Sequence, residues 1–300
     1  MENREEPQEN GSRRRIFERM SGSSVGQFVQ RNKIKTITAL LFLLFVAAIL
    51  PLPFDKIDDL RFSNPASTAF MKEHEAVARK KGRPFRKSQT WIPLKRIPKY
   101  VIDAIVVAED GTFWSHSGFD WFEFRVSLGR NLKEGRMARG ASTITQQIAK
   151  NLFLSPSKNP FRKLREWILT WYIERTVSKS RILEIYLNVI EWGNGIYGIE
   201  AASTHYFGKP AQDLSQNDAT RLAAIIPNPR RHGANEQSQY VTRRSSIILQ
   251  RMRARGMVSG DTNVTPPDSL ALIVSPAKLD SLIDEDNLIL QADSAEIQEE

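Results

Sequence analysis

Two adjacent acids, Glu109 and Asp110, stand where carboxylates could do chemistry. They follow an apolar run, Val101 to Ala108, that predicts a helix opened near its first turn by Pro98. The negative end of the helix dipole disfavours an ionised carboxylate, so folding gains nothing from acids placed there. A general base, which must accept a proton, could use the placement. A helix end with two solvated acids is the alternative interpretation.

A second polar group falls on one side of a helix predicted to begin at Thr143. Thr143 and Gln146 have the spacing of a capping pair, and Ile144, Ile148 and Leu152 recur as a buried stripe. The other side carries Gln146, Gln147, Lys150 and Asn151. Amide and ammonium groups can contact sugar hydroxyls and phosphate oxygens. An ordinary solvated helix face is the alternative.

A third acid, Glu166, is surrounded by cations. Arg162 and Glu166 are i,i+4 neighbours, and Lys163 lies between them. A surface ion pair worth roughly half a kcal/mol is one account of this spacing. The other account is a cluster of cations that binds a polyanion, with the carboxylate ordering the cluster.

The elements that must position these residues are predicted to be helices. From about residue 98 to 256 the hydrophobic pattern has helical spacing, with little alternation of period two. Asp120 followed by Glu123 resembles a capping box, so capping is a better prediction for Asp120 than catalysis. Three hundred residues allow one sizeable core with terminal appendages. We therefore expect a single, mainly α domain.

Charge and composition narrow the class of partner. The chain has a net charge of +9, but residues 257–300 hold ten acids and one lysine, so residues 1–256 carry +18. A basic body implies an anionic partner such as nucleic acid, anionic lipid or phosphate. The sequence has no cysteine, which excludes disulfides and thiolate chemistry.

A membrane segment is predicted near the N-terminus. Residues 36–54 are nineteen residues without a charge, roughly 28 Å as a helix, and seven Lys or Arg residues between 13 and 35 precede them. This pattern favours an uncleaved anchor with a cytoplasmic N-terminus over a signal peptide, and makes nucleic acid an improbable partner. The predicted organisation is a basic, disordered cytoplasmic tail (1–35), a transmembrane anchor (36–54), a membrane-proximal connector (55–97), a catalytic domain (98–256) and an acidic tail (257–300).

Taken together, these stretches resemble the peptidoglycan glycosyltransferases of family 51. The matching blocks are Glu109-Asp110-x-x-Phe113-x-x-His116-x-Gly118-x-Asp120, Gly140-x-Ser142-Thr143-Ile144-Thr145-Gln146-Gln147-x-x-Lys150-Asn151, Arg162-Lys163-x-x-Glu166, Ile182-Leu183-Glu184-x-Tyr186-Leu187-Asn188 and Gly193-x-Gly195-x-x-Gly198-Ile199-x-Ala201-Ala202-x-x-x-Tyr206-Phe207-Gly208-Lys209. They occur in family order over about 100 residues. Any one block is weak, but the ordered set is specific.

The chain is similar to the monofunctional branch of that family, because no Lys-Thr-Gly of a transpeptidase occurs and few residues follow position 256. Two positions depart from the family pattern. Ala141 stands where many members have a second glycine. Lys158 stands where many members have an arginine that holds the donor pyrophosphate; lysine keeps the charge and loses the bidentate fork.

The resemblance implies a lysozyme-like, two-lobed helical fold with an N-terminal transmembrane helix. It implies that lipid II is the acceptor and that an undecaprenyl-pyrophosphate-linked glycan is the donor, joined by an inverting β-1,4 transfer. Glu109 and Glu166 are then the catalytic residues, and His116, Glu184, Tyr186 and Asn188 brace the fold. The implied substrate-binding residues are Asp110, Phe113, Ser142, Thr143, Gln146, Gln147, Lys150, Asn151, Lys158, Arg162 and Lys163.

The resemblance requires no cofactor, and it leaves open a divalent cation, Mg or Mn, at Glu166. It places the protein in the bacterial cytoplasmic membrane as a single-pass protein with its catalytic domain outside, where other cell-wall synthesis proteins are potential partners. Two other functions stay open from the residues alone. A lysozyme-like hydrolase or lytic enzyme would also use glutamates beside a glycan. An inactive, membrane-anchored cell-wall scaffold could retain the same blocks.

Overall fold

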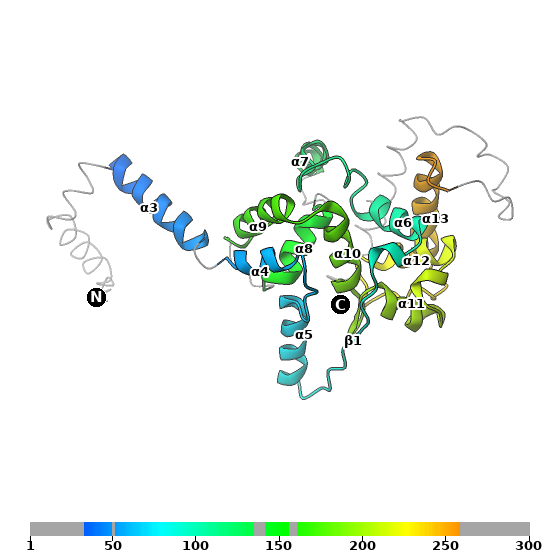
Figure 1. The fold of residues 1–300 in the computed structure, drawn as a ribbon. Helices are drawn as coiled ribbons and strands as arrows, with labels where there is room; N and C mark the ends of the chain where they lie inside the picture. The colour runs from blue at the N-terminus through cyan, green and yellow to red at the C-terminus, as the bar shows by residue number, and fades with distance from the viewer. Residues whose placement is uncertain (1–32, 50–51, 135–141, 156–160, 259–300) are drawn as a thin grey trace, which may run out of the picture. The chain divides into compact units, whose positions relative to one another are not determined.

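The computed structural model describes residues 33–49, 52–134, 142–155 and 161–258 (Figure 1). Lys158, Ala141, most of the basic tail and nearly all of the acidic tail lie outside these ranges. The chain divides into two compact units, 1–52 and 53–300, and each is described by itself.

The first unit contributes one described helix, α3 (Lys33–Ile49). It covers most of the apolar segment 36–54, whereas Phe54 at the end of that segment begins the next helix. Within the described ranges, no helix has both the length and the apolar character needed to cross a membrane.

The second unit is mainly helical, as predicted. Its α-helices are α4 (Phe54–Asp59), α5 (Ala69–Lys80), α6 (Lys99–Glu109), α7 (Trp121–Glu134), α8 (Ile144–Phe153), α9 (Arg162–Thr176), α10 (Lys179–Val189), α11 (Ile199–Phe207), α12 (Gln216–Ile225) and α13 (Gln239–Ala254). Two 3-10 turns, η1 (Leu94–Arg96) and η2 (Ala211–Asp213), lie between them. A small sheet has the order β1 (Ser88–Gln89), β3 (Ile196–Tyr197), β2 (Glu191–Gly193); β1 pairs with β3 in parallel, and β2 pairs with β3 antiparallel.

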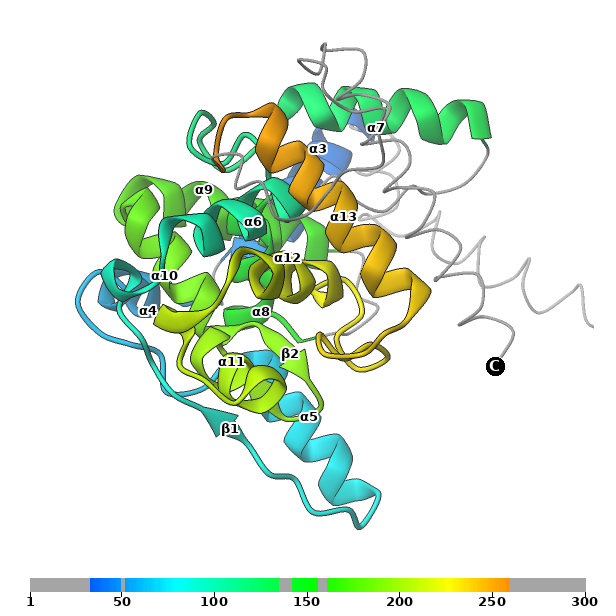
Figure 2. The ribbon, with the colours of Figure 1, turned by 90° about the vertical axis from the view of Figure 1, so that its right-hand side faces the viewer.

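The helices pack in two groups. Helix α6 packs against α12 and α13, as Figure 2 shows, and α8 packs against α9 and α10. Val101, Ala104 and Ile105 of α6 are fully buried, because the apolar run predicted from the sequence faces α12 and α13. Burial of that run fixes α6 and presents its last residue, Glu109, at the end of the helix.

Residues 55–97, predicted to be a membrane-proximal connector, lie within the second compact unit. Helix α4 packs on α9 and α5 packs on α8. Arg181 of α10 holds the chain after α4: its Nε donates to the Leu60 carbonyl at 2.9 Å, and its Nη2 donates to the Ser63 carbonyl at 2.7 Å. This packing was not predicted from the sequence because it depends on contacts with distant residues; the two hydrogen bonds of Arg181 span 121 and 118 residues.

Candidate active site

Glu109, the last residue of α6, is held by an amide from α8. Its Oε2 accepts a hydrogen bond from Nε2 of Gln147 at 2.8 Å. The amide oxygen of Gln147 accepts in turn from the hydroxyl of Tyr186 at 3.2 Å. Burial raises the pKa of Tyr186 well above its ordinary value, and Glu109 and Asp110 raise it further, so this hydroxyl keeps its proton and donates it. Gln147, predicted to line a sugar subsite, therefore orients the carboxylate.

Asp110 ties the end of α6 to the start of α8. Its Oδ2 accepts from the backbone N–H of Ile144 at 2.9 Å, and its Oδ1 lies 2.9 Å from Nε2 of His116. Because Nδ1 of His116 accepts from the N–H of Gly118 at 3.1 Å, the ring proton is on Nε2 and points to Asp110. His116 thus has the structural role expected of it.

Two of the predicted substrate-binding residues are buried. Asp110 is 7% exposed with both oxygens bonded to protein, and Phe113 is 0% exposed beneath the turn. The Lys179 ammonium lies 4.3 Å from the centre of the Phe113 ring. These side chains support the turn that follows Glu109, and their contact with substrate stays a prediction.

Thr143 and Gln146 form the N-terminal cap of α8. The Thr143 hydroxyl accepts from the Gln146 N–H at 3.2 Å and donates to the Gly118 carbonyl at 2.7 Å, while the Gln146 side chain accepts from the Thr143 N–H at 2.9 Å. The predicted capping pair is confirmed. Thr143 is 3% exposed and its hydroxyl is engaged in the cap. Its contact with sugar stays a prediction.

The cations collect between α8 and α9. Lys150 is half-buried on α8, and its ammonium lies 5.7 Å from the centre of the Phe70 ring. Burial lowers the pKa of Lys150; Glu166 and Glu109 raise it, while Arg162 and Lys163 lower it. Lys150 therefore shares one electrostatic environment with Glu109 and with the charged side chains of α9. Asn151 and Arg162 are half-buried in the same part of the domain.

Glu166 is 3% exposed and forms an ion pair with Lys163. Within the described ranges, no three His, Asp or Glu side chains come together as metal ligands. The ion pair with Lys163 allows this carboxylate to order the cations.

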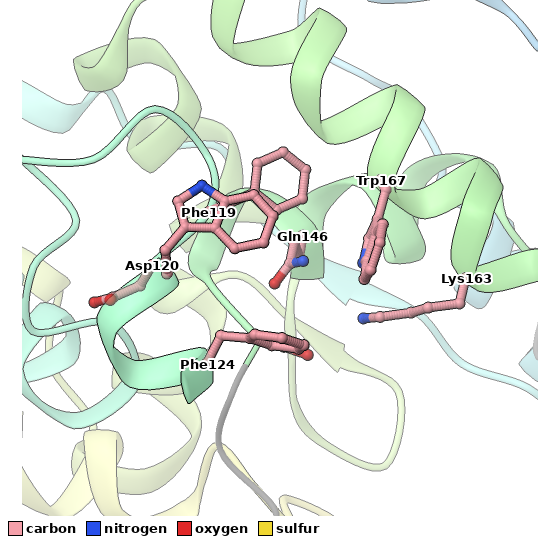
Figure 3. A pocket seen from close by; sticks show the side chains of 8 residues that line it. Phe119, Asp120, Phe124, Gln146, Lys163 and Trp167 are labelled. Carbon is pink, nitrogen blue, oxygen red and sulfur yellow. The ribbon is translucent and has the colours of Figure 1, made fainter. Parts of the chain in front are cut away.

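An aromatic pocket adjoins the cations (Figure 3). Its walls are Phe119, Asp120, Trp121, Phe124, Ser142, Gln146, Lys163 and Trp167. The Phe119 and Trp121 rings stack with centres 5.5 Å apart, and Lys163 points into the space beside the Trp167 ring. These aromatic walls were not predicted from the sequence, although the density of aromatic residues between 113 and 124 was an available signal.

Asp120 is the cap of α7, as predicted. Its Oδ1 accepts from the N–H of Glu123 at 2.8 Å, and its Oδ2 accepts from the hydroxyl of Thr112. Ser142 is exposed at the rim of the pocket, so its side chain is not fixed by burial as that of Thr143 is.

The arrangement defines a class of enzyme. A carboxylate oriented by an amide stands in the field of cations on a neighbouring helix pair. Such a site can take a proton from a hydroxyl and stabilise the negative charge of a departing phosphate. It is the site of a transferase that acts on a phosphate-activated donor.

The comparisons with known proteins agree with that class. The family model described as Transglycosylase matches residues 74–253. A biosynthetic peptidoglycan transglycosylase of Nitrosospira multiformis is 43% identical over 215 residues, which cover 71% of this chain and 94% of the relative. A protein of that name from Dechloromonas aromatica is 47% identical over 191 residues, 64% of this chain and 83% of the relative. The chain belongs to the transglycosylase family.

Proposed function

We propose that this protein polymerises the glycan strands of peptidoglycan by transferring a lipid-pyrophosphate-linked glycan to lipid II. The observation that carries the proposal is the electrostatic environment that Glu109 shares with the cations. The pKa of Lys150 is lowered by burial and is shifted as well both by Glu109 and by the charged side chains of α9. The names of the relatives, biosynthetic peptidoglycan transglycosylases, support the same reaction.

Glu109 acts as the general base. It takes the proton of the acceptor GlcNAc 4-hydroxyl as that oxygen attacks C1 of the donor MurNAc. The bond between C1 and the phosphate oxygen breaks, the leaving pyrophosphate keeps the electron pair, and the new β-1,4 bond has inverted configuration. The hydrogen bond from Gln147, itself held by Tyr186, aims the Glu109 carboxylate.

The cations stabilise the leaving group. Lys150, Arg162 and Lys163 offset the charge that develops on the pyrophosphate, and Glu166 keeps Lys163 in place through their ion pair. Lys158 lies outside the described residues, and its contact with the pyrophosphate stays a prediction. Gln146, Asn151 and Ser142 are the remaining candidates for contacts with the sugars, since Ser142 and Gln146 line the pocket beside Lys163.

We also propose a lysozyme-like fold with two lobes. One lobe is the group of α6, α12 and α13, and the other is the group of α8, α9 and α10. The turn after Glu109 joins them through the hydrogen bond from Ile144 to Asp110. A glycan bound between two such groups would meet the base from one side and the cations from the other.

The proposed location is the outer side of the bacterial cytoplasmic membrane, with segment 36–54 as a single anchor. The uncharged segment and the basic residues before it support this location. So do large aromatic side chains exposed on the domain: Trp121 is 57% exposed, Phe122 is 74% exposed and Trp171 is 49% exposed. The Arg175 guanidinium lies 4.5 Å over the Trp171 ring, a pairing suited to a membrane interface.

A hydrolytic function is less well supported. A lysozyme-like hydrolase needs a protonated acid at the leaving oxygen and has no use for cations at a pyrophosphate. The acid nearest the cations, Glu166, is ion-paired with Lys163. The relatives are named for synthesis, so neither hydrolysis nor an inactive scaffold is favoured.

The decisive experiment is the substitution Glu109→Gln. The amide keeps the shape of the side chain and cannot take a proton, so polymerisation of lipid II should fall about 10²- to 10⁴-fold while lipid II binding and the melting temperature stay unchanged. Glu75→Gln, at an exposed acid of α5, is the matched control and should polymerise normally. Polymerisation by Glu109→Gln at the wild-type rate would remove Glu109 from the mechanism. A wild-type protein that binds lipid II without turning it over would instead be a scaffold.

A further inference from the structure

Arg255 contacts the turn that follows the proposed base. Its Nη1 donates a hydrogen bond to the carbonyl oxygen of Gly111 at 2.8 Å, across 144 residues of sequence. Gly111 lies two residues after Glu109 and directly after Asp110. The contact comes from beyond residue 253, where the match to the family ends. No role in the proposed reaction assigned above involves this arginine.

The absence of a side chain at Gly111 lets the guanidinium lie against the backbone. A Cβ atom at this position would stand 2.6 Å from Nη2 and 2.7 Å from Nη1 of Arg255, too close for any real contact. Gly111 is not among the glycines with positive φ, so its backbone does not itself require glycine. A larger residue at this position would therefore have to displace the Arg255 guanidinium, the flexible end of its side chain.

The end of α13 determines where Arg255 points. Gly256 has a φ of +66°, its N–H donates to the Arg253 carbonyl at 3.0 Å, and the N–H of Met257 donates to the Met252 carbonyl at 3.0 Å. These are the two hydrogen bonds of a Schellman motif, which fix the backbone at the helix end. Since α13 packs on α6, the motif delivers Arg255 to the turn that follows α6.

The charge of Arg255 suits this place. The carbonyl groups at the C-terminal end of α6 carry partial negative charge, so a cation there is stabilised. Burial lowers the pKa of Arg255, while Glu123 near the start of α7 raises it, and arginine remains charged at neutral pH. A partly buried cation that donates a hydrogen bond to the turn constrains the turn more than an exposed cation would.

We propose that Arg255 is a positioning residue for Glu109: by holding the Gly111 carbonyl it fixes the turn and keeps the carboxylate aimed at the acceptor hydroxyl. The inference rests on the proposed role of Glu109 as the base. Arg255 touches neither substrate nor reacting atoms in this role. It acts through the backbone of Glu109, Asp110 and Gly111, and a displacement of about 1 Å at a reacting group costs roughly 10² in rate.

The test compares Arg255→Ala with Arg255→Lys in lipid II polymerisation. Arg255→Ala should lower kcat about 10- to 100-fold with KM and the lipid II Kd unchanged, because substrate binding does not depend on the aim of the base. Arg255→Lys, which keeps a charged donor, should recover part of kcat. Arg253→Ala, at an exposed arginine of the same helix turn, is the matched control and should behave as wild type. A wild-type kcat for Arg255→Ala would overturn the proposal, as would a loss of kcat matched by loss of the folded fraction.

A double-mutant cycle with Gly111→Ala makes the test independent of folding. In the wild-type background the added methyl group should displace the guanidinium and lower kcat; in the Arg255→Ala background it should have little further effect. Additive effects would overturn the proposal. Glu109→Gln in the same assay separates the two ideas: an inactive Glu109→Gln beside a fully active Arg255→Ala overturns only the role of Arg255. An active Glu109→Gln overturns the proposed function and this inference with it.

Discussion

A general base must be held still relative to the hydroxyl that it deprotonates. Gln147 holds the Glu109 carboxylate by a hydrogen bond, and Tyr186 fixes which end of the Gln147 amide faces that carboxylate. Because the Tyr186 hydroxyl is a donor, it selects the oxygen of Gln147 and leaves the NH₂ group for Glu109. Gln147 of α8 and Tyr186 of α10 therefore act together to hold one carboxylate oxygen of Glu109, the last residue of α6.

Lys150 illustrates a residue kept for function at a cost to stability. Its pKa is lowered first by burial, so the folded state binds the proton less tightly than the unfolded state. The folded state therefore gains stability as pH rises from the lowered pKa towards the ordinary value of 10.5. At neutral pH burial of this charge opposes folding. The proposed binding of an anion would account for a lysine at this position.

We predict that Lys150→Met melts at or above the wild-type temperature while losing affinity for lipid pyrophosphates. The methionine keeps an apolar stem and removes the buried charge. Wild-type affinity should also decline at alkaline pH before the ordinary lysine pKa is reached, since the lowered pKa releases the proton earlier. Lys72→Met, at an exposed lysine of α5, is the control for calorimetry and binding. Unchanged affinity in Lys150→Met would show that Lys150 does not contact the phosphates.

At the scale of elements, the site lies where the C-terminal end of α6 meets the N-terminal end of α8. The last turn of α6 supplies Glu109, and the next residue, Asp110, places its carboxylate on the N–H of Ile144 at the start of α8. An anion is stabilised at a helix N-terminus, so this contact favours α8 and fixes its position relative to α6. Gln147, one turn into α8, is thereby brought to Glu109.

Thr143→Ala tests whether Thr143 serves the helix or the substrate. We expect a loss of about 1 to 2 kcal/mol in the free energy of unfolding, because the cap of α8 and the bond to the Gly118 carbonyl both disappear. Lipid II affinity should not change. Thr143→Ser keeps the hydroxyl and should restore most of the stability in urea unfolding. A variant of normal stability with weakened binding would place Thr143 in the sugar subsite.

At the scale of the whole domain, residues 53–97 belong to the enzyme. Arg181 fastens the chain after α4, while α5 brings Phe70 to the ammonium of Lys150. The ring of Phe70 offers its electron-rich face to a partly buried cation, an attraction worth about 0.5 to 2 kcal/mol. The segment between the predicted anchor and the motifs thus takes part in building the cation site.

Arg181→Ala should destabilise the domain by about 2 kcal/mol, since it removes charged hydrogen bonds to the carbonyls of Leu60 and Ser63. Limited proteolysis should then cut near residues 60–64 before the rest of the domain. Arg61→Ala, at an exposed neighbour, serves as the control. An unchanged urea midpoint together with unchanged proteolysis would mean that Arg181 does not hold this segment.

The sequence by itself determined the local features. Helical spacing predicted α6 and α8, the capping pairs predicted the starts of α7 and α8, and the ordered motifs pointed to Glu109 and the cations. These features depend on residues within one or two helix turns of each other, so they can be predicted from the sequence alone. The same spacing could not tell whether a polar side chain turns outward to substrate or inward to a cap.

Only the tertiary structure decided which distant groups meet. Gln147 reaches Glu109 across 38 residues, and Arg255 reaches Gly111 across 144 residues. It also placed Asp110, Phe113 and Thr143 in the interior, where each packs or hydrogen-bonds against protein groups. The physical reason is that burial and long-range hydrogen bonds are set by how the helices pack against one another, and that packing is not encoded in any single helix.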